Sequence, residues 1–123
     1  IVTSPTGSGK TLAFILPIVT HVTDQPHIVP NVDGPIAIVL TPTRELAKQV
    51  HLIAKKVLNV VGGKAVAVTG GSGTYEMSKE LKKGCELVVS TPGRFIDMVK
   101  RKATNCKRIT FVVLDEADKM FDM

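Results

Sequence analysis

The sequence predicts an α/β domain in which a mostly parallel β-sheet is flanked by helices. Its 123 residues fit a single domain with a buried core. Short runs rich in β-branched residues recur along the chain and are apolar on both faces, as expected for strands of a parallel sheet covered on both sides. The segments between these runs are long enough for crossover helices. The expected order therefore alternates strand and helix in a doubly wound arrangement.

The predicted strands are short apolar runs that are followed by polar residues. The four clearest are 37–40 (AIVL), 65–69 (AVAVT), 86–90 (ELVVS) and 110–114 (TFVVL). An apolar start at Ile1 and Val2 is interpreted as the end of a further strand.

The segment 43–61 is the clearest helix. Its apolar residues recur at intervals of three and four, while Arg44, Lys48, Lys55 and Lys56 face away from them. This pattern predicts an amphipathic helix packed on the sheet.

Other helices are predicted at 12–16, which reads as a buried helix, at 74–83 and at 93–102. The segment 24–35 contains three prolines and a glycine, so we expect a loop there.

Composition limits the class of protein. The net charge of +5 and the pI near 9.4 suit a polyanionic partner without requiring one. Cys85 and Cys106 match neither a redox pair nor a zinc site, so they are interpreted as buried or half-buried thiols of a reducing, intracellular compartment. No apolar run is long enough to span a bilayer and no signal peptide is recognisable, so no membrane association is expected. The chain starts and stops inside expected elements, and both ends are interpreted as cuts in a longer protein.

The segment SPTGSGKT at 4–11 predicts a phosphate site. Gly7 and Gly9 allow the backbone N–H groups to curl toward an anion, Lys10 adds a positive charge, and Thr11 supplies a hydroxyl of the kind that ligates Mg²⁺. Ser4 replaces the first glycine of the usual phosphate-loop pattern. The alternative interpretation is a Gly/Ser-rich turn between a strand and a helix.

The segment VVLDEAD places two carboxylates at the end of a buried strand. Asp115 is a candidate for holding Mg²⁺, and Glu116 is a candidate base for the attacking water. The alternative is a solvated acidic helix start. Because ligands of open parallel sheets bind beyond the carboxyl ends of the strands, all the polar motifs that follow the strands are expected at one edge.

The motifs TGSGKT, PTRELA, GG, TPGR and DEAD, in this order over the whole chain, resemble the DEAD-box RNA helicases of helicase superfamily two. The resemblance implies that 1–123 is the N-terminal RecA-like, ATP-binding P-loop domain, truncated at both ends. The segment 100–123 further resembles a subgroup tied to pre-mRNA splicing.

The resemblance implies ATP and Mg²⁺ as cofactors. Lys10 would contact the β- and γ-phosphates, Thr11 and Asp115 would organise Mg²⁺, Glu116 would activate water, and Asp118 would couple the ATP site to a later motif. The implied catalytic residues are Lys10, Asp115 and Glu116, and the implied nucleotide-binding residues are Thr6, Gly7, Ser8, Gly9, Lys10, Thr11 and Asp118.

The resemblance also implies contacts to the RNA backbone. These fall on Pro42, Thr43, Arg44, Gly70, Gly71, Thr91, Pro92, Gly93 and Arg94. Each of the three motifs has a structural alternative: Thr43 as a helix N-cap and Arg44 in solvent, the two glycines as a turn, and Arg94 capping a tight loop. With one Tyr and no Trp, the chain offers little for base stacking, so sequence-independent binding is expected.

The function implied is an RNA-dependent ATPase and helicase, nuclear and/or cytoplasmic, that locally unwinds duplexes or remodels RNP. Its second RecA-like domain, its adenine-recognition motif and its Ser-Ala-Thr motif fall outside this chain, so the isolated segment is expected to be inactive. There are two alternatives. The first is a binding module that keeps the nucleotide site but no turnover, and the second is a nucleotide kinase. The presence of Lys10, Thr11, Asp115 and Glu116 argues against the first, and the PTRELA and TPGR motifs argue against the second.

Overall fold

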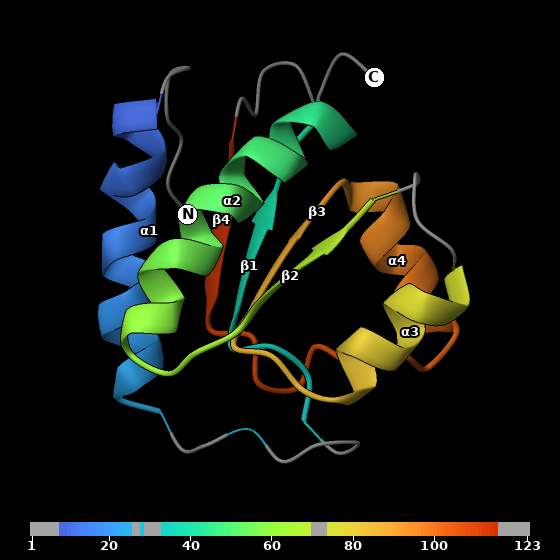
Figure 1. Cartoon of the computed structure of the whole chain (residues 1–123). Helices are drawn as coiled ribbons and strands as arrows, with labels where there is room; N and C mark the ends of the chain where they lie inside the picture. The colour runs from blue at the N-terminus through green and yellow to red at the C-terminus, as the bar shows by residue number, and fades with distance from the viewer. Residues whose placement is uncertain (1–7, 26–27, 29–32, 70–73, 116–123) are drawn as a thin grey trace.

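A computed structural model describes residues 8–25, 28, 33–69 and 74–115 (Figure 1). Helices and strands alternate along this part of the chain, as the sequence predicts. The elements are α1 (Ser8–Thr23), β1 (Ala37–Leu40), α2 (Arg44–Val60), β2 (Ala65–Val68), α3 (Thr74–Lys82), β3 (Leu87–Ser90), α4 (Pro92–Lys100) and β4 (Phe111–Leu114).

The four described strands form one parallel sheet in the order β2-β3-β1-β4. Leu40 pairs with Ser90 on one side and with Leu114 on the other, and Val68 also pairs with Ser90. All four strands therefore end at the same level of the sheet.

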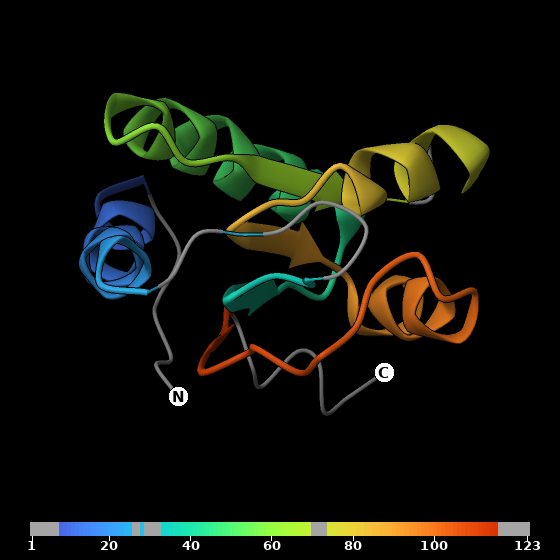
Figure 2. The same cartoon turned by 90° about the horizontal axis from the view of Figure 1, so that it is seen from below.

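The order of the strands explains which face each helix covers. From β1 to β2 the chain moves across the sheet in one direction, and from β2 to β3 and on to β4 it moves back. Because parallel crossovers are right-handed, a reversal of direction moves the connecting helix to the opposite face. Accordingly α2 packs on one face with α1, while α3 and α4 cover the other (Figure 2).

The core on the first face joins α1 and α2 to alternate strand residues such as Val39, Val89 and Val113. In α1 only part of the predicted 12–16 helix is buried: Phe14 and Ile15 are in the core, whereas Leu12 and Leu16 are exposed. The prediction of a wholly buried helix there is wrong, because a helix turns consecutive apolar residues away from the sheet.

The core on the second face joins α3 and α4 to the other strand residues. Cys85 belongs to this core, and burial raises the pKa of its thiol to about 12. Cys106 is exposed, which corrects its prediction as a buried or half-buried thiol. Both cysteines are free thiols.

The predicted strands agree with the observed ones within one residue, and the predicted helix 43–61 agrees with α2. The predicted helix 93–102 starts one residue earlier, at Pro92, because proline has no N–H and suits the first position of a helix. Residues 24, 25, 28 and 33–35 of the predicted loop lie outside helices and strands. Among the described helices, none has the length and apolar character needed to cross a membrane.

Candidate functional site

A row of polar residues lies just beyond the carboxyl ends of the strands. Because the strands end in register, the residues that follow them come in the order Thr69, Thr91, Thr41 and Asp115 across the sheet. Thr69, Thr41 and Asp115 are buried. The predicted convergence of the motifs on one edge is confirmed for the motifs that the structure describes.

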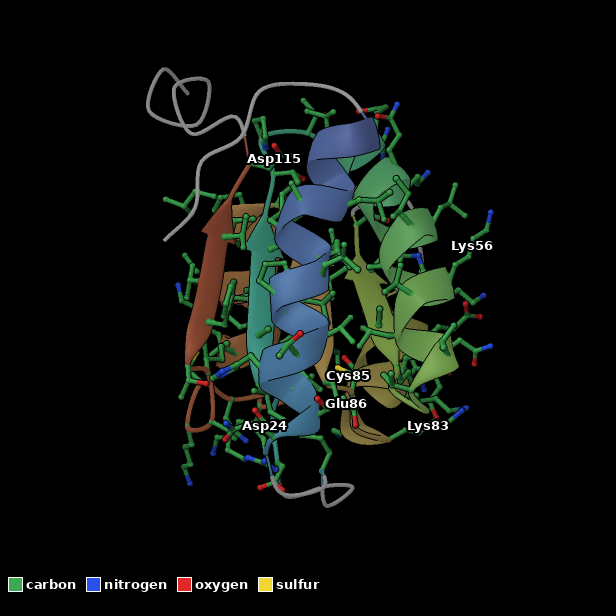
Figure 3. The ribbon with its side chains drawn as sticks, turned by 90° about the vertical axis from the view of Figure 1, so that its left-hand side faces the viewer. Asp24, Lys56, Lys83, Cys85, Glu86 and Asp115 are labelled. Atoms are coloured by element: carbon green, nitrogen blue, oxygen red, sulfur yellow. The ribbon has the colours of Figure 1, made fainter. Side chains whose placement is uncertain are left out.

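Asp115 is held at this edge by the backbone. Its N–H donates to the carbonyl oxygen of Leu40 at 2.9 Å, which continues the β1–β4 ladder by one residue, and its side chain is buried. Figure 3 shows Asp115 at the end of the molecule where α1 begins. Glu116 and Asp118, which the sequence also predicts for this site, lie outside the described residues.

The amino end of α1 lies at the same edge. The first turn of α1 contains Ser8, Gly9, Lys10 and Thr11 and no acidic residue, whereas the first turns of α2 and α3 contain Glu45 and Glu76. The positive end of the α1 dipole is therefore not neutralised by its own first turn, which suits an anion. Thr6 and Gly7 lie outside the described residues.

The PTR segment after β1 forms the start of α2. Thr43 has extended backbone angles, and its hydroxyl oxygen accepts the N–H of Leu46 at 3.2 Å, which confirms its predicted role as the N-cap. The buried hydroxyl of Thr41 donates to the carbonyl oxygen of Thr43 at 3.0 Å and fixes the turn from the inside. Arg44 stays exposed and lies 3.7 Å from Glu45.

The TPGR segment after β3 forms the start of α4. Thr91 occupies the N-cap position without a side-chain cap bond, Pro92 is the first helical residue, and Gly93 and Arg94 follow in the first turn. The expected tight loop around Gly93 and Arg94 is therefore wrong, since both are helical. The Arg94 guanidinium donates to the carboxylate of Asp97 at 2.8 Å, and Arg94 is only 21% exposed.

Residues 1–123 match the family described as DEAD/DEAH box helicase. The chain belongs to this family. It is 54% identical over 121 residues to DEAD-box ATP-dependent RNA helicase 42 of rice, covering 96% of this chain and 11% of that protein. It is 52% identical over 118 residues to human ATP-dependent RNA helicase DDX42, covering 96% of this chain and 12% of that protein.

Solved structures of DEAD-box proteins share the fold of this DEAD-box chain. The yeast DEAD-box splicing factor Prp28 superposes with a TM-score of 0.87 at 39% identity, over 98% of this chain and 28% of that one. The RNA helicase Prp28 from Chaetomium thermophilum, bound to ADP, superposes with a TM-score of 0.83 at 38% identity, over 97% of this chain and 29% of that one. A DEAD-box protein from Methanococcus jannaschii superposes with a TM-score of 0.76 at 34% identity, over 98% of this chain and 32% of that one. The predicted RecA-like fold is thus confirmed.

Two features at or near the carboxyl edge of the sheet were not predicted from the sequence. The first is the Asp97 carboxylate, which accepts from Arg94 and also from Arg101 at 3.2 Å. Its spacing of three residues from Arg94 was an available signal. The second is a basic groove along β2, which requires the tertiary structure. Gly70 and Gly71 lie outside the described residues.

Proposed function

We propose that this chain is part of an ATP-dependent RNA helicase that couples ATP binding and hydrolysis to RNA binding and to local unwinding or RNP remodelling. The observation that carries the proposal is the common edge: the amino end of α1, Asp115 and the starts of α2 and α4 all lie beyond the carboxyl ends of one parallel sheet. This is where open α/β sheets bind ligands. The names of the rice and human relatives support ATP and RNA as the ligands.

The nucleotide part of the proposal assigns ATP to the amino end of α1. The residues present fit a magnesium nucleotide, since a helix amino end without acidic residues suits phosphate and a strand-end carboxylate is a ligand that Mg²⁺ accepts. Bound Mg²⁺ would supply positive charge at the phosphates. Lys10 would contact the phosphates, and Thr11 and Asp115 would hold the metal. A relative described as bound to ADP supports this assignment.

Hydrolysis is assigned to Glu116, the carboxylate after the proposed metal ligand Asp115. Glu116 takes a proton from the attacking water, and Asp118 couples this site to the rest of the motor. The remaining positive charge comes from a second RecA-like domain of the full-length chain.

The RNA part of the proposal assigns backbone contacts to the starts of α2 and α4. The N–H groups at the amino end of α4, whose first turn has no acidic residue, and the exposed Arg44 at the start of α2 favour phosphate oxygens, which carry no base information. RNA as the partner suits a nuclear or cytoplasmic protein. The described splicing role of yeast Prp28 supports the resemblance of 100–123 to the splicing subgroup.

Two substitutions in the full-length protein separate binding from turnover. Lys10→Ala should weaken ATP binding by roughly 1.5 to 3 kcal/mol, about tenfold or more, because it removes a charge-assisted hydrogen bond to phosphate. Glu116→Gln should keep ATP and RNA binding but lower turnover by roughly 10² to 10⁴-fold. Calorimetry and phosphate release measure the two effects, with Lys56→Ala on α2 as the control. An unchanged ATP affinity in Lys10→Ala would contradict the nucleotide assignment.

A further inference from the structure

A cavity of about 460 Å³ lies between α2 and the outer strand β2. One wall is formed by Lys48, His51, Lys55 and Asn59 of α2, and the opposite wall includes Glu80 of α3. The floor follows β2 from Gly63 to Thr69, the residue that follows this strand at the carboxyl edge. We call this cavity the β2 groove; Figure 1 shows the three elements that contribute its lining, α2, β2 and α3.

The α2 wall of the groove starts at a proposed RNA contact. Arg44, Lys48, His51, Lys55 and Asn59 are spaced by four, three, four and four residues, so they share one face of the helix. Each step of four residues advances roughly 6 Å along the helix axis. Because α2 begins at the carboxyl edge, this stripe leads from Arg44 into the β2 groove.

The groove has a surplus of positive charge. Within the described part of the chain, Lys48 and Lys55 form no ion pair, and both are exposed. Glu80 is already compensated, since it accepts from Lys64 at 2.9 Å and from Lys83 at 3.1 Å. The hydrogen bond from Lys64, followed by that from Lys83, lowers the pKa of Glu80, so this carboxylate stays ionised and paired at neutral pH.

The floor of the groove presents backbone groups. The carbonyl of Lys64 accepts from Leu87 and so points toward β3, whereas the carbonyl of Ala65 accepts from the His51 ring at 3.0 Å and points toward α2. Because alternate residues of a parallel strand point their backbone groups to the same side, the N–H of Ala67 also points toward the groove. Backbone N–H groups and lysines are the donors that phosphate oxygens accept in nucleic-acid complexes.

We propose that the β2 groove binds the backbone of single-stranded RNA that continues from the carboxyl edge, with Lys48 and Lys55 contacting different phosphates along the strand. This inference rests on the proposed function, since it extends the RNA path beyond Arg44. The groove adds affinity only when the RNA is long enough to reach it, and the added affinity is independent of sequence because the donors meet phosphates.

The test uses the full-length protein and uridine oligomers lengthened in steps of about two nucleotides, with affinity measured by fluorescence anisotropy at several salt concentrations. The double variant Lys48→Gln/Lys55→Gln should bind short oligomers like the wild type and long ones more weakly. Because this variant cannot neutralise two of the phosphates, its salt slope for long RNA should be smaller by about 1.4. Between 50 and 200 mM salt, the wild type should thus lose about sevenfold more affinity for long RNA than the variant does.

Lys56 provides the matched control. It neighbours Lys55 on α2 and is exposed (Figure 3). It is not among the residues that line the groove. Lys56→Gln should leave the salt slope unchanged, and Lys55→Arg should preserve binding because it keeps the charge. If the double variant is misfolded, the salt slopes of Lys55→Gln and Lys56→Gln for long RNA still test the proposal, since only Lys55→Gln should lower the slope.

The outcomes separate the two proposals. If the wild type binds short RNA, and the wild type and the double variant bind long RNA equally well, the groove proposal alone is wrong. Equal effects of Lys55→Gln and Lys56→Gln overturn it as well, since charge in general would then be responsible. A wild type that binds neither oligomer overturns the proposed function too.

Discussion

Two turns of this domain share the pattern Thr-Pro-x-Arg, yet they build different helix starts. Residues 41–44 follow β1, and residues 91–94 follow β3. In the first turn the helix begins at the arginine, whereas in the second it begins two residues earlier, at the proline.

The third residue of the pattern explains this shift. Thr43 has a side-chain oxygen that accepts the N–H of Leu46, so the cap falls on Thr43 and Pro42 stays outside the helix. Gly93 has no side chain with which to cap, and the helix starts at Pro92 instead. A single side chain thus moves the helix start by two positions.

The shift changes what each arginine can do. Arg44, the first residue of α2, has a side chain that is 53% exposed, and its Nε lies 3.7 Å from Oε1 of Glu45, too far for a hydrogen bond. Arg94, two residues into α4, is held by Asp97 at 2.8 Å. An ordered arginine loses less conformational entropy on binding a phosphate than an exposed one does. The same four-residue pattern therefore places one half-buried, paired arginine and one exposed arginine at the proposed RNA edge.

The largest effect is expected from removing the ordered arginine in the full-length protein. Arg94→Ala should weaken RNA binding by roughly 1.5 to 3 kcal/mol for all sequences alike and lower the salt slope by about 0.7, while Arg44→Ala should cost less. Arg101→Ala is the control, because Arg101 shares Asp97 but is not a proposed RNA contact. A larger loss for Arg44→Ala would reverse this ranking, and a change in base preference would contradict a contact to the RNA backbone.

A smaller effect is expected on folding. Thr43→Ala removes the cap of α2 and should lower the free energy of unfolding by about 1 kcal/mol, whereas Thr91→Ala should cost little because Thr91 makes no side-chain cap bond. Urea unfolding measures the difference, and amide exchange at Leu46 reports it locally. Thr43→Ser, which keeps the acceptor, should restore stability. Equal losses at the two threonines would show that the caps do not differ.

The smallest effect has opposite signs in two measurements. Among the described residues, no atom beyond the neighbours of Gly93 and the backbone of its own helix lies within 4 Å of a Cβ placed there, so Gly93→Ala should stabilise the helix start by about 0.5 kcal/mol. If the glycine keeps the backbone accessible to a phosphate, the same change should weaken RNA binding. Increased stability with unchanged RNA affinity would show that Gly93 has no such role.

Local patterns made most of the fold predictable. The β-branched run 37–40 is β1 itself, and the three-and-four spacing in 43–61 identifies α2. Thr43 was recognisable as a cap because it precedes that helix. The position of Asp115 followed from its place after a buried run.

Features that depend on long-range packing were not predictable. β1 pairs with β3 and β4 rather than with β2, which follows it in the chain, because crossovers and not sequence order decide strand neighbours. The exposure of Leu12 and Leu16 depends on which side of α1 meets the sheet. The β2 groove combines residues of two helices and a strand, so no local pattern indicates it.

The outer position of β2 also bears on self-association. A strand at the border of a sheet offers unpaired backbone groups to a strand of another molecule, and such contacts start aggregation. Here β2 is only four residues long, the His51 ring takes the outward carbonyl of Ala65, and Lys48 and Lys55 place like charges beside it. A second copy approaching this border meets repulsion and an occupied acceptor. The stripe proposed to hold RNA should therefore also disfavour pairing between copies of the domain at high concentration.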